Sequence, residues 1–243
     1  MADVNKIDLK EIQIKLYESL IPSGWGVKLK VFLLSEEFHH ILQTLYDQSK
    51  SGIRFTPQIK HLFRFLEECP YNKLNVVFMG QDPYPGIYEG ITVADGISFS
   101  CRNTRMVQPS LRYMFKEIEE TVYPLEGYEW DPDLTRWANQ GVLMMNTALT
   151  TSINKVGSHY ELWKPFIEYL FDVLAFGSPN IIYVFCGKKA KEWEDSVPNN
   201  NFKITCTHPA SAAHNSQEKW DSGDLFNRIN IRLYSTNGYK IKW

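Results

Sequence analysis

The chain has 243 residues, of which 44% are apolar and 22% are charged, so it can bury a substantial core. Its 26 basic and 28 acidic residues give a net charge of −2, which excludes a generally basic coat for nucleic acid. No run of about 18 apolar residues occurs, and the first residues contain no apolar signal core. We therefore expect an intracellular protein, in the cytoplasm or the nucleus, that is neither secreted nor held in a membrane.

The first 70 residues are predicted to be largely helical, because apolar residues recur near a 3.6-residue period at 33–45 and again at 59–66. From residue 74 the pattern changes to short apolar runs that suit buried strands. These runs lie at 74–79, 141–145, 181–185 and 202–206. Helical patterns lie between and after them, one beginning at Pro109 and others at 160–176, 189–193 and 223–234.

This alternation of strands and helices predicts an α/β fold. We expect a three-layer sandwich with a central four-stranded parallel sheet and helices on both faces. No Gly/Pro/Ser-rich linker divides the chain, so we expect a single domain over 1–243. Its helical N-terminal part is expected at about 1–70 and its α/β core at about 71–243.

The four cysteines, Cys69, Cys101, Cys186 and Cys206, are scattered without a C-x-x-C pair. A zinc or iron–sulfur site built on paired cysteines is therefore not indicated. Reduced, mostly buried thiols are the expectation.

Polar residues follow each predicted strand directly. They are Gln81 and Asp82 after the first strand, Asn146 after the second, Gly187-Lys188 after the third and His208 after the fourth. The carboxyl ends of parallel strands share one edge of a sheet, where open α/β folds bind their ligands. These side chains are therefore expected to converge there.

Each of these residues has an ordinary explanation when it is considered alone. Asp82 precedes a proline in a typical turn dipeptide, Asn146 suits a helix cap, and His208 suits a hydrogen-bonded loop histidine. Phe99 suits the core. The set is more informative than its members, since a carboxylate, an amide, an aromatic ring and an imidazole suit a pocket for a flipped nucleobase. Motifs of serine hydrolases, P-loop proteins and zinc proteases are missing from the sequence.

Several segments match the motifs of one family in the right order. Gly80–Gly86 (GQDPYPG) resembles the water-activating loop of family 1 uracil-DNA glycosylases. Gly96–Ser100 (GISFS) and Trp137–Thr147 (WANQGVLMMNT) are similar to two further segments of that family. Ser158-His159 and the terminal Ile241–Trp243 (IKW) also fit, so the resemblance spans roughly 21–243.

The resemblance implies a monofunctional glycosylase that removes uracil from DNA without a metal or a cofactor. Asp82 would orient or deprotonate the attacking water, and it would offset positive charge on the sugar. His208 would hydrogen-bond the uracil O2 and stabilise the departing uracil anion.

The resemblance also implies a set of base-binding residues. Gln81 would line the pocket, and Tyr84 would exclude the methyl group of thymine. Phe99 would stack on uracil. Asn146 would bond the O4 and N3–H edge, whose polarity is reversed in cytosine.

The segments that would hold DNA depart from the family's pattern. The loop after the fourth strand reads HPASAA where the family has H-P-S-P-L-S, so the leucine that wedges into the duplex falls on Ala212. The loop between Asp82 and Phe99 is a few residues longer than usual, and Asp95 stands where the family commonly has histidine. The expected DNA-contacting residues are Ser110, Gly187, Lys188, Pro209, Ala210, Ser211, Ala212 and Ala213.

We therefore expect a monomer that prefers uracil in single-stranded DNA over duplex DNA, and that a DNA-mimicking protein inhibitor of the family could bind. An alternative is that His214 or the longer loop at 87–93 supplies the wedge. Two other functions remain open at this point. One is a glycosylase for another modified base, which Tyr84 disfavours. The other is a non-catalytic DNA-binding or replication-accessory protein, which the intact Asp82, Asn146 and His208 disfavour.

Overall fold

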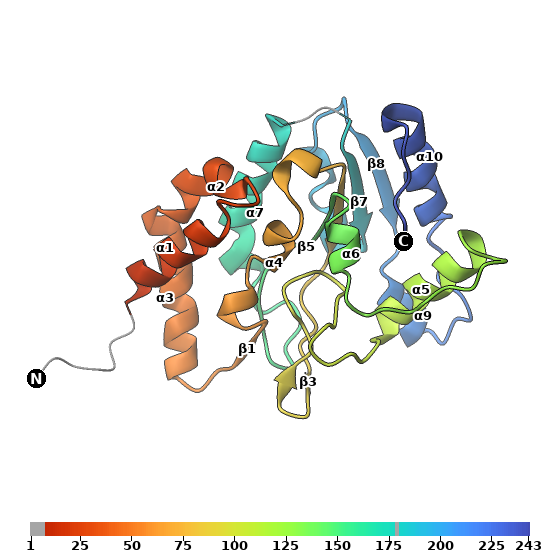
Figure 1. The fold of residues 1–243 in the computed structure, drawn as a ribbon. Helices are drawn as coiled ribbons and strands as arrows, with labels where there is room; N and C mark the ends of the chain where they lie inside the picture. The colour runs from red at the N-terminus through yellow and green to blue at the C-terminus, as the bar shows by residue number, and fades with distance from the viewer. Residues whose placement is uncertain (1–7, 178–179) are drawn as a thin grey trace, which may run out of the picture.

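The N-terminal part is a small group of helices packed against one end of the molecule (Figure 1). The computed structural model describes residues 8–177 and 180–243, so the start of the predicted helical region, at 1–7, lies outside the described residues. Helices α1 (Leu9–Ser19), α2 (Trp25–Leu33) and α3 (Glu36–Lys50) follow one another. Asp8 accepts hydrogen bonds from the first turn of α1, and the Ser35 hydroxyl accepts one from the Phe38 N–H at the start of α3.

The prediction of a continuous helical pattern at 59–66 is partly wrong. This region forms a 3₁₀ turn, η1 (Ile59–His61), and a short helix, α4 (Arg64–Glu67). Just before them, β1 (Phe55–Thr56) pairs with the distant β6 (Thr151–Ser152). A second 3₁₀ turn, η2 (Tyr71–Lys73), leads into the sheet.

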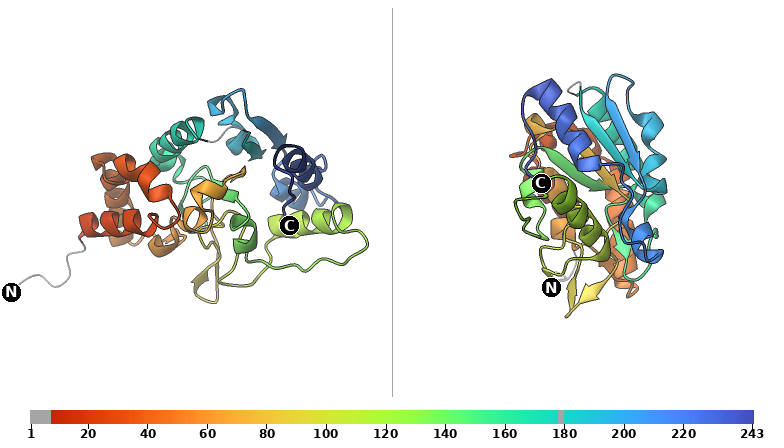
Figure 2. Two further views of the ribbon diagram at one scale, coloured as in Figure 1. Left: turned by 45° about the horizontal axis from the view of Figure 1, so that its top comes forward. Right: turned by 90° about the vertical axis from the view of Figure 1, so that its right-hand side faces the viewer.

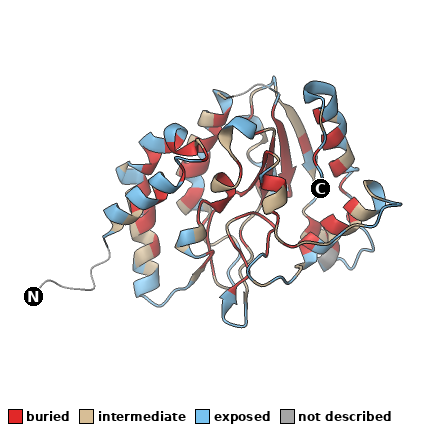
Figure 3. Ribbon diagram, in the orientation of Figure 1, coloured by how far each residue is buried: buried red, intermediate tan, exposed pale blue. Residues whose placement is uncertain are grey.

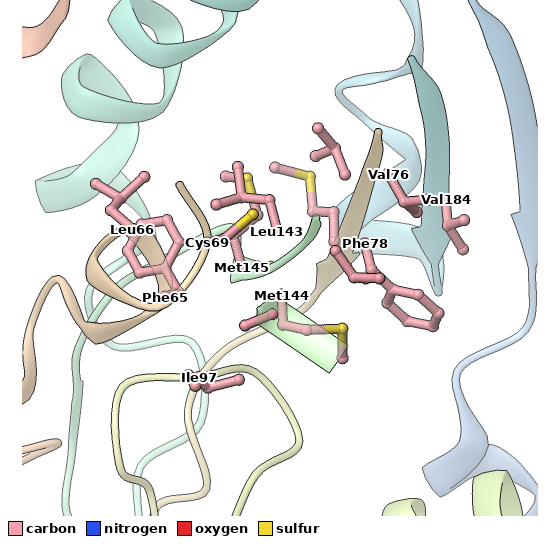
Figure 4. Close-up of a cluster of buried hydrophobic side chains, with 14 of the residues drawn as sticks. Phe65, Leu66, Cys69, Val76, Phe78, Ile97, Leu143, Met144, Met145 and Val184 are labelled. Carbon is pink, nitrogen blue, oxygen red and sulfur yellow. The ribbon is translucent and has the colours of Figure 1, made fainter. Parts of the chain in front are cut away.

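The central sheet confirms the predicted α/β fold. Its strands are β2 (Val76–Gly80), β5 (Val142–Asn146), β7 (Ile182–Cys186) and β8 (Phe202–Cys206), in the order β5-β2-β7-β8 and all parallel. Every residue of β2, β5 and β7 is buried, as their apolar runs require, whereas β8 lies at an edge and is partly exposed (Figure 3). Figure 4 shows side chains of these strands packed among Phe65, Leu66 and Ile97.

Helices cover both faces of the sheet. One face carries α5 (Pro109–Thr121), α6 (Thr135–Ala138) and α10 (Leu225–Asn237), and the other carries α7 (Tyr160–Ala175), α8 (Lys188–Lys191) and the 3₁₀ turn η3 (Glu194–Ser196) (Figure 2). Trp137 of α6 contacts Phe226 of α10, with ring centroids 6.1 Å apart. Helices α5, α7, α8 and α10 confirm the predicted positions to within a few residues, whereas α6 was not predicted.

The connections leave the sheet in opposite directions. The chain passes from β2 to β5 on one side and from β7 to β8 on the other, so the loops after β2 and β7 diverge. A crevice at such a divergence is where open α/β sheets place ligands. The register aligns Gly80 of β2 with Asn146 of β5, and Cys186 of β7 with Cys206 of β8, so four loops leave the same edge together.

Two elements near this edge were not predicted. One is a hairpin of β3 (Ile87–Tyr88) and β4 (Ile91–Thr92), which falls in the longer loop. The other is α9 (Pro209–His214), a short helix in the segment that follows His208.

The four cysteines are free, and Cys69, Cys101 and Cys186 are buried, as expected. Within residues 8–177 and 180–243, no helix is long and apolar enough to span a membrane.

Candidate active site

The residues predicted to converge do so around one cavity. It has a volume of about 530 Å³ and lies at the carboxyl edge of the sheet. Its lining includes eight of the predicted site residues: Gln81, Asp82, Tyr84, Phe99, Ser110, Asn146, His208 and Ala210. They come from the loops after β2 and β8, the end of β5, the segment that carries Phe99, and the first turns of α5 and α9. Residues far apart in the sequence, from Gln81 to Ala210, thus meet because the parallel strands end together.

Asp82 is held by the turn that precedes α7. The Gly157 N–H donates a hydrogen bond of 2.7 Å to its Oδ2. Burial raises the pKa of the Asp82 carboxyl, and this N–H together with the nearby Thr151 and Tyr160 hydroxyls opposes the rise. The side chain is therefore a partly desolvated, oriented carboxylate at the cavity wall, which is the environment of a general base.

Asn146, the last residue of β5, is fixed by a neighbour from another loop. The Ser98 hydroxyl donates a hydrogen bond of 2.6 Å to the Asn146 Oδ1, and both side chains are buried. This packing requires glycine at position 80, since a Cβ there would lie 2.5 Å from Ser98 Oγ and 2.6 Å from Asn146 Oδ1. The amide is thus presented to the cavity in one orientation.

Phe99 forms an aromatic wall of the cavity. Its backbone has φ of +64°, a left-handed conformation that bulky residues rarely adopt and that is often associated with functional sites. Its ring is 94% buried and lies 5.5 Å from the imidazole of His208, at an interplanar angle of 33°.

The Phe99 loop is held by Asp95, one of the departures from the family's pattern. Its carboxylate accepts hydrogen bonds from the Ile97 N–H, the Ser100 hydroxyl and the Arg102 N–H, on both sides of Phe99 in the chain. The buried guanidinium of Arg64 lies 2.8 Å from the same carboxylate. Asp95 therefore stabilises the unusual backbone that presents the ring.

His208 is a partly buried, neutral imidazole. The Ala210 N–H donates a hydrogen bond of 3.1 Å to Nδ1, so the ring proton is on Nε2. Burial lowers the pKa of His208 to about 4, and the nearby His214 contributes to the decrease. Gly187 packs directly against this histidine, because a Cβ at position 187 would lie 2.8 Å from the Cβ of His208. At neutral pH the side chain is thus an N–H donor without a charge.

Ala212, one of the expected DNA-contacting residues, is buried in the structure. Residues 209–214 form α9, which packs against α5, and Ala212 faces inward with 0% of its surface exposed. The residue aligned with the family's wedge is thus part of the core in this structure. Pro209 is also buried. The helix was missed because the segment was compared with an irregular loop, although alanine favours helix formation.

The other expected DNA-contacting residues differ in position and exposure, and the side chain of Ala213 lies outside what the structure describes. Lys188 is exposed at the start of α8 and does not line the cavity, and neither does Gly187. The Ser211 hydroxyl donates to the His208 carbonyl oxygen at 2.7 Å, so it stabilises the start of α9.

Sequence reasoning missed several residues that line or hold the site, among them Val156 and three others. The three others are Ser98, which lies inside a recognised motif; Gly157, which directly precedes the Ser158-His159 match; and His214, which had been considered only as a wedge. In the described parts of the chain, no group of three or more His, Cys, Asp or Glu side chains is placed to hold a metal ion.

Comparisons with known proteins show the family of this chain. The sequence profile of the Uracil DNA glycosylase superfamily matches residues 66–233. The chain is 33% identical over 190 residues to a uracil-DNA glycosylase of Streptococcus uberis, covering 77% of this chain and 83% of the relative. It is 31% identical over 206 residues to one of Acinetobacter baumannii, covering 84% of each.

A solved structure extends the similarity to nearly the whole chain. The crystal structure of mimivirus uracil-DNA glycosylase superposes with a TM-score of 0.81 at 26% identity, over 98% of this chain and 90% of that one. A variant of the mimivirus enzyme solved in complex with UGI has a TM-score of 0.79 over 91% of this chain and 88% of that one. The chain belongs to the uracil-DNA glycosylase superfamily.

Proposed function

We propose that this protein is a uracil-DNA glycosylase that hydrolyses the N-glycosidic bond of a uracil flipped out of DNA and leaves an abasic site for base excision repair. The observation that carries the proposal is the convergence of Asp82, Phe99, Asn146 and His208 on one cavity. Family membership agrees with it. A non-catalytic role would give no reason for a half-buried carboxylate and a neutral imidazole to line the same cavity.

The proposed reaction uses the two titratable groups of the cavity, Asp82 and His208. Water attacks the sugar C1′ while the C1′–N1 bond breaks, and its electron pair leaves with the uracil. Asp82 orients the water and accepts its proton, and its negative charge stabilises the oxocarbenium-like sugar. The Nε2–H of His208 donates a hydrogen bond to O2 of the departing uracil anion. A neutral donor suits this role, since it stabilises the anion without transferring a full proton.

The other cavity residues select the base. Asn146 accepts a hydrogen bond from N3–H and donates one to O4, which matches uracil and mismatches cytosine. Phe99 stacks on the ring, and Gln81 lines the pocket. Tyr84 occupies the space next to C5, which disfavours thymine and the alternative of a glycosylase for bases modified at that position.

The substrate is uracil-containing DNA, with single strands preferred over duplex. Flipping a base out of a duplex costs a few kcal/mol that a single strand does not require. The position aligned with the family's wedge is buried, so it offers nothing to fill the vacated stack. Lys188 attracts phosphate as an exposed charge, which salt screens. The preference for single strands should therefore widen as salt increases.

We also propose that the protein is a monomer and that a DNA-mimicking protein inhibitor binds it. The UGI complex of the mimivirus variant supports the inhibitor as a partner.

The decisive experiment measures uracil release from a single-stranded oligonucleotide with one uracil, in the presence of EDTA. We expect free uracil and an abasic site, and no product from matched cytosine or thymine oligonucleotides. A lack of uracil release would refute the proposed function.

Asn146→Asp tests base selection in the same assay. We expect this variant to release some cytosine, because a protonated carboxyl group can present the complementary edge to cytosine. If this variant releases no cytosine, the assignment of Asn146 as the base reader is wrong.

A further inference from the structure

The hairpin of β3 and β4 is an unassigned element that leaves the catalytic loop itself. It begins directly after Pro85 and Gly86, and the Val93 N–H closes its base by donating to the Gly86 carbonyl oxygen at 3.1 Å. Its two-residue turn has φ of +47° at Glu89 and +80° at Gly90, as a tight type I′ turn requires. The hairpin is therefore a defined structure, and it projects from the lower edge of the molecule in Figure 1.

Strand alternation places the two large apolar side chains of the tip on one face. The register pairs Ile87 with Thr92 and Tyr88 with Ile91. Thr92 is 7% exposed, so its pair faces the protein, whereas Tyr88 and Ile91 are 41% and 46% exposed. An aromatic and an aliphatic side chain thus lie side by side in water, on an element with little other packing.

This face is continuous with the rim of the catalytic cavity. Pro85 lines the cavity and accepts a hydrogen bond of 3.0 Å from the Asn154 N–H. Two residues after Asn154 comes Val156, which also lines the cavity and is 57% exposed. Tyr88 is three residues beyond Pro85, a reach of about 10 Å for an extended chain. Stacked bases are spaced about 3.4 Å apart along a strand, so this reach from Pro85 equals about three base spacings.

We propose that the outward face of the hairpin, formed by Tyr88 and Ile91, binds an unpaired base that flanks the uracil in single-stranded DNA. This inference rests on the proposed function, since it requires the uracil strand to enter the cavity. The chemistry of the tip selects bases over phosphates. The only charged residue between Gly86 and Ala94 is Glu89, which repels phosphate, whereas an exposed aromatic ring stacks on any base.

The test compares Tyr88→Ala with the wild-type protein on two uracil substrates. One is a minimal substrate with a single nucleotide on each side of the uracil, and the other is a single strand of about 15 nucleotides. We expect KM for the long strand to increase about fivefold or more, the lower end of the range for one stacked base, with kcat unchanged. The minimal substrate should show no change. Tyr88→Phe should restore the wild-type KM, and the increase should persist at high salt because no phosphate contact is lost.

Tyr234→Ala is the matched control. Tyr234 is an exposed tyrosine near the end of α10, a helix whose last residue, Asn237, bonds Asn75 beside the opposite edge of the sheet. This variant should leave both substrates unchanged.

Two outcomes would overturn the inference. An equal loss on both substrates would show that Tyr88 supports the catalytic loop, and an unchanged KM on the long strand would show that it contacts no base. Binding of uracil-free single-stranded DNA, measured by fluorescence anisotropy, separates these failures from a failure of the proposed function. If the wild-type protein releases no uracil, weaker binding by Tyr88→Ala would still support the hairpin contact, and equal binding would refute it.

Discussion

The floor and the rim of the cavity are built in different ways. The floor consists of side chains at the ends of buried parallel strands, where the register aligns Gly80 with Asn146 and the loops leave together. The rim consists of α9 and the β3–β4 hairpin, which are short elements with exposed surfaces. Strand ends have little freedom, since moving one would disrupt the core, whereas a rim segment can change its backbone without affecting the sheet.

This difference predicts where substitutions have large effects. In the proposed function, a change on the floor alters groups that touch the reacting atoms or the base. A change on the rim alters how DNA is held, or only the stability of the protein. The variants below test that division.

Asp82→Asn should have the largest effect. The amide keeps the shape and can still face the Gly157 N–H, but it cannot accept a proton from water. General-base help alone is worth about 10²–10⁴ in rate, so we expect a loss of that order in uracil release. The melting temperature and circular dichroism spectrum check the fold. Full activity with a native spectrum would contradict the role of Asp82.

Gly187→Ala should have the next largest effect, through His208. The added Cβ would lie 2.8 Å from the Cβ of His208, and φ at Gly187 is +93°, so the histidine loop has to move. A displacement of about 1 Å near reacting groups can cost about 10²-fold in rate. We expect kcat to fall by roughly that factor.

Gly238→Ala is the control for backbone strain. Its φ is +75°, and a Cβ there meets nothing within 4 Å. It should lower the free energy of unfolding by about 1 kcal/mol and leave kcat unchanged. If both variants lost activity equally, the contact with His208 would not be the cause.

The pH dependence of activity should reflect the burial of His208. Its pKa is lowered to about 4, so the imidazole stays neutral well below the usual histidine range. Burial raises the pKa of Asp82, which must be ionised. Both groups therefore reduce kcat/KM on the acid side, by about tenfold per pH unit once each has titrated. A profile of wild-type kcat/KM from pH 4 to 8 should show no fall centred at the ordinary histidine pKa of about 6.5. A fall centred there, removed in His208→Gln, would show that this imidazole is solvated.

The same burial affects stability. The unfolded chain protonates histidine at about pH 6.5, whereas folded His208 and the buried His159 both have a pKa of about 4. Between those values the unfolded state binds more protons, so the free energy of unfolding should fall as pH decreases from about 6.5 to about 4. Urea titrations across this range would measure it, and His159→Gln should reduce the slope.

The sequence could predict the floor because its geometry follows from strand positions. The apolar runs located β2, β5, β7 and β8, and the parallel arrangement then brought Asp82, Asn146 and His208 together without knowledge of any side-chain contact. The tyrosine, phenylalanine and glutamine of the pocket required the resemblance to a family, since nothing in their spacing distinguishes them from core or turn residues.

The rim could not be predicted in the same way. Whether residues 209–214 form a loop or a helix depends on contacts with α5, which lies about 100 positions earlier in the chain. The support of Phe99 by Asp95 depends likewise on the distant Arg64. Such contacts are tertiary, and local sequence does not encode them.

Ala212→Leu should have the smallest effect on activity, although this position is aligned with the residue that inserts into DNA in the family. Ala212 is fully buried at the contact between α9 and α5, so a leucine would point into the core and not toward the strand. Overpacking of this kind typically costs about 1–3 kcal/mol, which we expect as a lower free energy of unfolding. The ratio of duplex to single-strand uracil release should not rise.

His214→Leu is the matched test on the exposed side of the same helix, where the side chain lines the cavity and the core is not disturbed. If α9 can present a wedge at all, this variant should increase duplex activity relative to single-strand activity, while Ala212→Leu should not. A gain in duplex activity by Ala212→Leu would mean that α9 unfolds into a loop on DNA, and that the division between a fixed floor and a variable rim extends to the bound state.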